Sequence, residues 1–187
     1  IFDLEQSREI DAQLLHRMNE SQFHRGPDEA GYHLGPGIAL GHRRLSIIDI
    51  ATGQQPLFND DRSIAIVYNG EVYNFKELRA ELEALGYLFQ THSDTEVILH
   101  LMARNPRDNP VESLMVALEQ LEGAYSLLLM TGSCLVAARD PNGFRPLLLG
   151  DYQGRNCFAS ETIAMDLLDV GARRELEPGE VVVARNG

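Results

Sequence analysis

The 187-residue sequence has few cysteines, no excess of basic charge and no long apolar run. Its two cysteines, Cys134 and Cys157, are too few for a disulfide framework, and no CxxC or Cys/His cluster indicates zinc. A reducing, cytoplasmic setting is therefore expected. The net charge of −12 comes without a basic block, which disfavours nucleic acid as a partner. We expect neither a metal nor a cofactor.

Segments that would indicate a membrane or a nucleotide are also missing. The apolar stretch between Leu127 and Ala138 is interrupted at residues 131–133, so it is too short to cross a bilayer. The first residues lack the basic and apolar regions of a signal peptide. No GxGxxG, GxxxxGK[ST] or GxSxG motif occurs. With 44% hydrophobic residues and a length typical of one domain, residues 1–187 are expected to form a single globular domain without membrane contact.

Apolar residues recur at helical spacing in five segments. Asn74 is expected to cap the second helix, with Glu77 as its capping-box partner and Gly86 as its end. Asn109 is expected to cap the fourth, because Pro110 follows it. The predicted helices run from about Glu9 to Gln22, from Asn74 to Gly86, from Thr95 to Arg104, from Asn109 to near Gly123, and from Glu161 to Leu168.

Short strands are also predicted, most of them joined by hairpins, as at the turn Gly35-Pro36-Gly37. Hairpins favour an α+β fold over a doubly wound parallel sheet. The strands of the last third are apolar nearly throughout, which is typical of burial on both faces, so we predict two packed sheets covered by helices. The predicted strands are Gly31–Leu34, Ile38–His42, Leu45–Ile50, Ile64–Tyr68, Tyr87–Thr91, Ala124–Thr131, Cys134–Arg139, Pro146–Gly150, Asn156–Ala159 and Glu180–Ala184.

The candidate chemistry lies in three polar clusters. The six histidines have no metal-binding spacing, and both cysteines lie in apolar surroundings typical of buried, inert thiols. Asn69-Gly70 has two interpretations, as a hairpin turn or as an amide and an N–H that form an oxyanion hole. The arginines form either a solvated rim or a binding group. The clusters are His24-Arg25-Gly26-Pro27-Asp28, Gly41-His42-Arg43-Arg44-Leu45-Ser46 and Tyr68-Asn69-Gly70-Glu71.

Together these clusters resemble the glutaminase domain of class II glutamine amidotransferases, which are N-terminal-nucleophile (Ntn) hydrolases. The front part, from Ile1 to about Ala103, is similar to asparagine synthetase, and the part from about Asn109 onward is similar to amidophosphoribosyltransferase. Further motifs of the front part are Ile1-Phe2-Asp3-Leu4, Gln55-Pro56-Leu57 and Ser93-Asp94-Thr95-Glu96-Val97. Those of the back part are Glu122-Gly123-Ala124-Tyr125-Ser126, Arg139-Asp140-Pro141-Asn142-Gly143-Phe144-Arg145-Pro146-Leu147 and Ala159-Ser160-Glu161-Thr162.

The resemblance implies a four-layer αββα sandwich of two mainly antiparallel sheets. It implies hydrolysis of the L-glutamine side-chain amide to glutamate and ammonia, without a cofactor, for a synthase or phosphoribosyltransferase domain. In the family an N-terminal cysteine attacks the amide, and its own α-amino group, which titrates at about 7.7–8.0, serves as base.

The resemblance also implies roles for particular residues. The Asn69 amide and the Gly70 N–H would form the oxyanion hole. Arg44 would hold the α-carboxylate of glutamine, and Asp94, assisted by Glu71, its α-ammonium group. The residues whose backbone would line the substrate slot are Leu45, Ser46, Ile47 and Ile48.

The start of the sequence departs from the family pattern. Family members begin Cys-Gly-Ile-x-Gly just before the Ile-Phe pair that stands here at residues 1 and 2. The sequence begins at Ile1, which supplies no thiol, and it contains no SGGxDS or phosphoribosyl-binding segment. We therefore expect this chain by itself to bind glutamine without hydrolysing it. Two alternatives stay open: a non-catalytic module for glutamine or a partner, and a designed or recombined structural domain.

Overall fold

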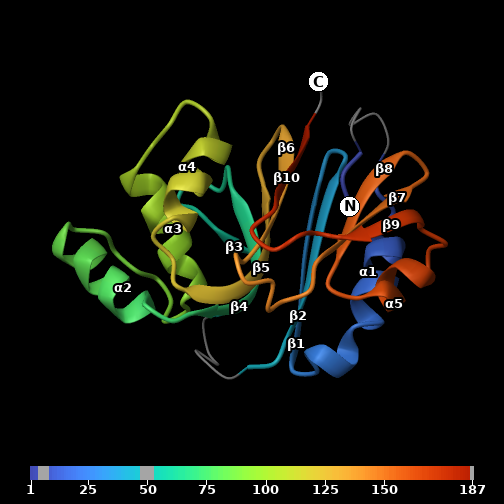
Figure 1. Ribbon diagram of the computed structural model, residues 1–187, viewed down its shortest axis with the longest axis horizontal. Helices are drawn as coiled ribbons and strands as arrows, with labels where there is room; N and C mark the ends of the chain where they lie inside the picture. Colours follow the sequence, from blue (N-terminus) through green and yellow to red (C-terminus); the bar gives the residue numbers. More distant parts are fainter. Residues whose placement is uncertain (4–8, 47–52, 186–187) are drawn as a thin grey trace.

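Two antiparallel β-sheets pack face to face in the computed structural model, which describes residues 1–3, 9–46 and 53–185 (Figure 1). One sheet has the strand order β10-β6-β5-β4-β3. Its strands are β3 (Leu57–Phe58), β4 (Ala65–Val72), β5 (Gly123–Met130), β6 (Cys134–Arg139) and β10 (Val181–Arg185). The other combines a hairpin with a three-stranded group. Its strands are β1 (Glu29–Gly35), β2 (Ile38–Arg44), β7 (Leu148–Tyr152), β8 (Arg155–Ala159) and β9 (Gly171–Glu175).

Helices cover the outer face of each sheet (Figure 1). The five-stranded sheet packs against three helices through one apolar cluster, and the second sheet packs against two helices through another. The first group consists of α2 (Phe75–Ala84), α3 (Thr95–Arg104) and α4 (Pro110–Leu118). The second consists of α1 (Ala12–Glu20) and α5 (Thr162–Asp166), and the 3₁₀ turn η1 (Phe23–Arg25) follows α1. The predicted α+β fold with four αββα layers is therefore confirmed.

The central strands are apolar on both faces because each face meets a different layer. Along β5, Leu127 and Leu129 pack into the cluster beneath the helices, whereas Leu128 and Met130 face the other sheet. Both Leu127 and Leu129 are almost completely inaccessible. Full burial of one such leucine contributes about 1.5–3 kcal/mol relative to exposure, so these strands anchor both the helical layer and the sheet pair.

Local signals placed several helix ends correctly. Helix α3 has the predicted bounds, and the Asn109 side chain caps α4 by accepting from the Val111 N–H at 3.0 Å. Gly86, after α2, has the positive φ of 94° that glycine tolerates best. The capping role predicted for the Asn74 side chain is wrong. It donates instead to the Gln120 carbonyl, 2.9 Å away, and accepts from the Glu122 N–H, which ties α2 to the start of β5.

The strand predictions need several corrections. Asn69-Gly70 is not a hairpin turn, because β4 continues to Val72. Tyr87–Thr91 is not a strand, and the short strands β3 and β9 were not predicted. Leu45 and Ser46 lie beyond the end of β2, and the rest of the predicted strand to Ile50 lies outside the described residues.

The beginning of the chain joins the two parts of the second sheet. Phe2 pairs with Ile38 of β2 on one side and with Asn156 of β8 on the other, antiparallel to both. Ile1 exchanges two hydrogen bonds of 2.9 Å with the backbone of Ala39. Phe2 is completely buried between the sheets. Residues 1 and 2 therefore run between β2 and β8, antiparallel to both.

A buried carboxylate fixes the approach to α3. Glu96 accepts hydrogen bonds from the backbone N–H groups of Gln90 and Thr91, both 2.7 Å away, and from the Thr91 hydroxyl at 2.6 Å. Its Oε1 also lies 3.3 Å from Nε2 of His100. Burial alone would raise the pKa of Glu96, but these hydrogen bonds outweigh it and lower the pKa to about 2.

We expect Glu96→Gln to lower Tm at pH 7 by roughly 4–8 °C, because charge-assisted hydrogen bonds of about 2 kcal/mol are lost. The lowered pKa means that the stabilisation is fully present above pH 5 and disappears as pH falls towards 2. The gap in Tm between parent and variant should therefore shrink on acidification. Thermal melts at pH 7, 5 and 3 measure it, with the exposed Glu119→Gln as control. A gap that stays constant with pH would contradict this assignment.

Candidate active site between the sheets

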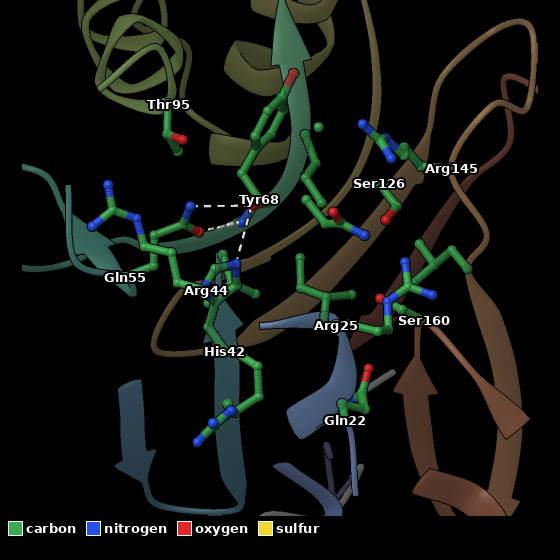
Figure 2. Close-up of a pocket in the computed structure, with 18 of the residues that line it drawn as sticks. Gln22, Arg25, His42, Arg44, Gln55, Tyr68, Thr95, Ser126, Arg145 and Ser160 are labelled. Atoms are coloured by element: carbon green, nitrogen blue, oxygen red, sulfur yellow. Dashed lines mark hydrogen bonds between the residues drawn. The ribbon is translucent and has the colours of Figure 1, made fainter. Parts of the chain in front are cut away.

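A cavity of about 500 Å³ opens between the two sheets (Figure 2). One wall comes from the end of β2 and the residues that end β8, and the other comes from β4 and β5. Residues 93–95, at the start of α3, also line it. The structure brings six of the nine predicted site residues to this cavity: Arg44, Leu45, Asn69, Gly70, Glu71 and Asp94. Ser46 is not among the lining residues, and Ile47 and Ile48 lie outside the described residues.

Arg44 is the last residue of β2 and is largely buried, with 9% of its surface exposed. It lies opposite Glu29 in the β1–β2 register, and its Nη1 donates to Glu29 Oε2 at 2.8 Å. Next to it, the backbone N–H of Ser46 donates to Asp28 Oδ2 at 2.8 Å. The ion pair with Glu29 fixes the direction of a guanidinium group at the cavity wall.

Asn69 and Gly70 lie within β4, where alternate residues face opposite layers. Tyr68 packs towards the helices, with its ring stacked on that of Tyr125 at 5.8 Å between centroids. The next residue, Asn69, therefore faces the cavity side, and its side-chain amide makes no hydrogen bond to any other described residue. At Gly70 a Cβ would come within 2.1 Å of the Ala124 carbonyl oxygen, so β5 leaves room only for glycine. An amide and a backbone N–H are thus presented side by side.

Asp94 lies directly before α3 at the same cavity, and it is only 7% exposed. Its Oδ2 accepts from the Val72 N–H at 2.9 Å, just beyond Gly70 and Glu71 in β4. Burial raises the pKa of Asp94, which outweighs the lowering effect of that hydrogen bond. A cation that binds here would compensate the buried negative charge, so the position favours a ligand with an ammonium group.

The structure adds polar residues that the sequence-based prediction did not place here, among them Arg25, His42, Gln55 and Arg145. Arg25 is held by Glu161, with 2.6 Å between Nη1 and Oε1. All four belong to motifs already quoted, and only the fold shows that they meet at one cavity. Burial lowers the pKa of His42 to about 4, so its imidazole is neutral near pH 7.

The part of the chain that the structure describes contains neither a metal-binding cluster nor a helix that could span a membrane. Within residues 1–3, 9–46 and 53–185, no three His, Cys, Asp or Glu side chains come together in a way that could hold a metal ion. No described helix is both long enough and apolar enough to cross a bilayer.

The four-layer αββα fold is shared with structural neighbours that are amidotransferases of the Ntn-hydrolase type. The match to the glutamine amidotransferase domain family runs from residue 1 to residue 181, and the chain belongs to that family.

Enzymes of two kinds are among the relatives. Amidophosphoribosyltransferase of Rhizobium etli is 42% identical over 157 residues, which cover 79% of this chain and 31% of that protein. Glutamine-hydrolysing asparagine synthetase 1 of Bacillus subtilis is 41% identical over 151 residues, which cover 80% of this chain and 23% of that protein. The chain thus spans less than a third of either relative. The predicted resemblance to both kinds of enzyme is confirmed.

Solved structures agree with the sequence comparison. The glutamine phosphoribosylpyrophosphate amidotransferase of B. subtilis matches with a TM-score of 0.84 and 33% identity, over 95% of this chain and 45% of that one. A glutamine aminotransferase class-II domain protein from Silicibacter pomeroyi matches with a TM-score of 0.56 at 19% identity over 82% of this chain and 71% of that one, which shows a shared fold alone.

Proposed function

We propose that residues 1–187 form one glutaminase domain and that the cavity binds L-glutamine as a zwitterion. The observation that carries the proposal is the presence of Arg44 and Asp94 on the walls of one cavity. Asn69 and Gly70 lie in β4, between Tyr68 and Val72. The Tyr68 carbonyl contacts His42, which lies in β2 near Arg44, and the Val72 N–H donates to Asp94. The guanidinium group of Arg44, the donors of the Asn69-Gly70 pair and the carboxylate of Asp94 therefore follow one another along the cavity.

Each group suits one part of glutamine. The guanidinium of Arg44 offers planar donors to the α-carboxylate. Buried Asp94 would accept from the α-ammonium group, with Glu71 adding negative charge nearby. The side-chain carbonyl of glutamine would then reach the Asn69 amide and the Gly70 N–H, which stabilise the oxyanion that forms when a nucleophile attacks. The backbone of Leu45, Ser46, Ile47 and Ile48 remains the proposed lining of the slot.

In the proposed reaction, a cysteine thiolate at the amino end of the domain attacks the amide carbon of glutamine and displaces ammonia, and water then hydrolyses the resulting thioester to glutamate and the free thiol. Residues that precede Ile1 would continue antiparallel along β2, whose residues Gly41 to Arg44 line the cavity. The names of the relatives support transfer of the ammonia to a synthase or phosphoribosyltransferase domain. Both cysteines are free and buried, in line with a cytoplasmic location.

Calorimetry with L-glutamine tests the binding part of the proposal. We expect saturable binding by the parent chain. Arg44→Ala or Asp94→Asn should weaken it about 10- to 100-fold, which corresponds to the loss of one charge-assisted hydrogen bond of about 1.5–3 kcal/mol. The matched controls are the exposed Arg174→Ala and Asp151→Asn, which should bind like the parent. Equal affinities for all five proteins would contradict the assignment of the cavity.

A further inference from the structure

The backbone of Tyr68, directly before the Asn69-Gly70 pair, is held by side chains from two other segments (Figure 2). The Tyr68 N–H donates to Oε1 of Gln55 at 2.6 Å, and Nε2 of Gln55 donates to the Tyr68 carbonyl at 3.0 Å. Nε2 of His42 lies 3.2 Å from the same carbonyl oxygen. A carbonyl has two lone pairs and can accept both bonds. The carbonyl of the peptide group that leads from Tyr68 into Asn69 is therefore held by two side chains, and Gln55 also holds the N–H of the preceding peptide group.

Gln55 takes the place of a neighbouring strand. β3 pairs with β4 only at Ile66 and Ala65, so it ends before Tyr68 is reached. The Gln55 amide supplies the donor and the acceptor that a longer β3 would have supplied. Gln55 is only 8% exposed, and a Cβ on Gly31 of β1 would lie 1.6 Å from its carbonyl oxygen. The backbone of Gln55 is thus packed directly on the second sheet.

His42 connects the Tyr68 carbonyl to the other wall of the cavity. It belongs to β2, two residues before Arg44, and its ring reaches across the cavity to β4 in the opposite sheet. The charged groups that act on its ring are Arg44 and Glu29. Because burial keeps the imidazole neutral near pH 7, its Nε2 must carry the proton to serve as donor to the Tyr68 carbonyl. One carbonyl oxygen therefore joins the wall that carries Arg44 to the strand that carries Asn69.

We propose that Gln55 and His42 are positioning residues, which hold the Tyr68–Asn69 peptide and so set the Asn69 and Gly70 donors at a fixed distance from Arg44. The inference rests on the proposed function, because it assumes that these donors contact the glutamine side chain. Neither residue needs to touch glutamine. Their effect passes through the backbone of β4, where a rotated peptide plane would turn the Asn69 amide away from the ligand.

The test uses Gln55→Met, which keeps the length of the side chain and removes both hydrogen bonds. Gln54→Met is the matched control, because Gln54 is the exposed neighbour of the same type. Hydrogen exchange followed by NMR reports on the Tyr68 amide without any ligand, and calorimetry reports glutamine affinity. We expect exchange at Tyr68 to become at least about tenfold faster in Gln55→Met, and affinity to fall about tenfold, with neither change in Gln54→Met.

A double-mutant cycle separates positioning from general loss of stability. The effect of Gln55→Met on affinity should largely vanish in an Asn69→Ala background and persist in an Arg44→Lys background. Should Gln55→Met fail to fold, Gln55→Glu serves in its place, because it keeps the acceptor for the Tyr68 N–H and loses the donor. Unchanged glutamine affinity together with fast exchange at Tyr68 would overturn this inference and leave the proposed function standing. Absence of glutamine binding by the parent would overturn the proposed function and the inference with it.

Discussion

A protein in which Cys-Gly-Ile-Val-Gly precedes Ile1 is expected to release ammonia from glutamine at least about 10³-fold faster than the same protein with serine in place of that cysteine. The reason lies in how residues 1 and 2 pair with β2. Ile1 pairs with Ala39, so five added residues would run opposite residues 40–44 of β2. Four of these five partners line the cavity, and the cysteine would face Arg44. The thiol would thus arrive beside Asn69 and Gly70.

The pH profile of this extended protein gives a second measurement. If the free α-amino group of the cysteine acts as base, the rate should rise through its pKa of about 7.7–8.0. The residual thiols are not expected to contribute, since Cys157 is completely buried and burial raises its pKa. Equal ammonia release by the cysteine and serine versions, measured over several turnovers, would refute the proposed mechanism.

Replacing Asn69 by alanine in the extended protein is expected to lower kcat by about 10²–10³, with a smaller change in KM. The amide donor gains most when negative charge develops on the substrate oxygen, so its loss should affect the reaction more than binding. Steady-state kinetics measures both constants. The exposed Asn142→Ala, in the turn after β6, should leave them unchanged. If KM falls by the same factor as kcat in Asn69→Ala, the amide contributes no stabilisation in the transition state, and the prediction is wrong.

Gly70 offers a poorer test of the same oxyanion pair. A methyl group there would meet the Ala124 carbonyl oxygen at 2.1 Å, so Gly70→Ala is expected to disturb the β4–β5 pairing as well as the site.

The sequence predicted the layers better than it predicted the cavity. Strands such as Cys134–Arg139 had the right bounds because a strand buried on both faces is apolar at every position, which a short window detects. Asn69-Gly70 looked like a turn because that dipeptide favours hairpins. The local preference is overridden because β4 keeps pairing with β5 as far as Val72 and Gly123.

The positioning contacts had no signal in the sequence. Gln55 and His42 act on Tyr68 from segments far from it in the chain, and their meeting depends on how two sheets face each other. Arg44 and Asp94 were found only because their motifs resemble those of a family, not because any spacing placed them at one cavity. Side chains that join distant strands require the fold itself.

The position of Phe2 has a consequence for synthesis on the ribosome. Phe2 completes the second sheet by pairing with Asn156, at the other end of the chain, as well as with Ile38. Chains emerge amino end first, and contacts between distant segments form late because loop closure is costly. Phe2 can therefore pair with Ile38 early in synthesis, but its pairing with Asn156 forms only after β8 has left the exit tunnel. An unfinished chain would therefore lack the assembled cavity until β8 and the residues after it that line the cavity have been made.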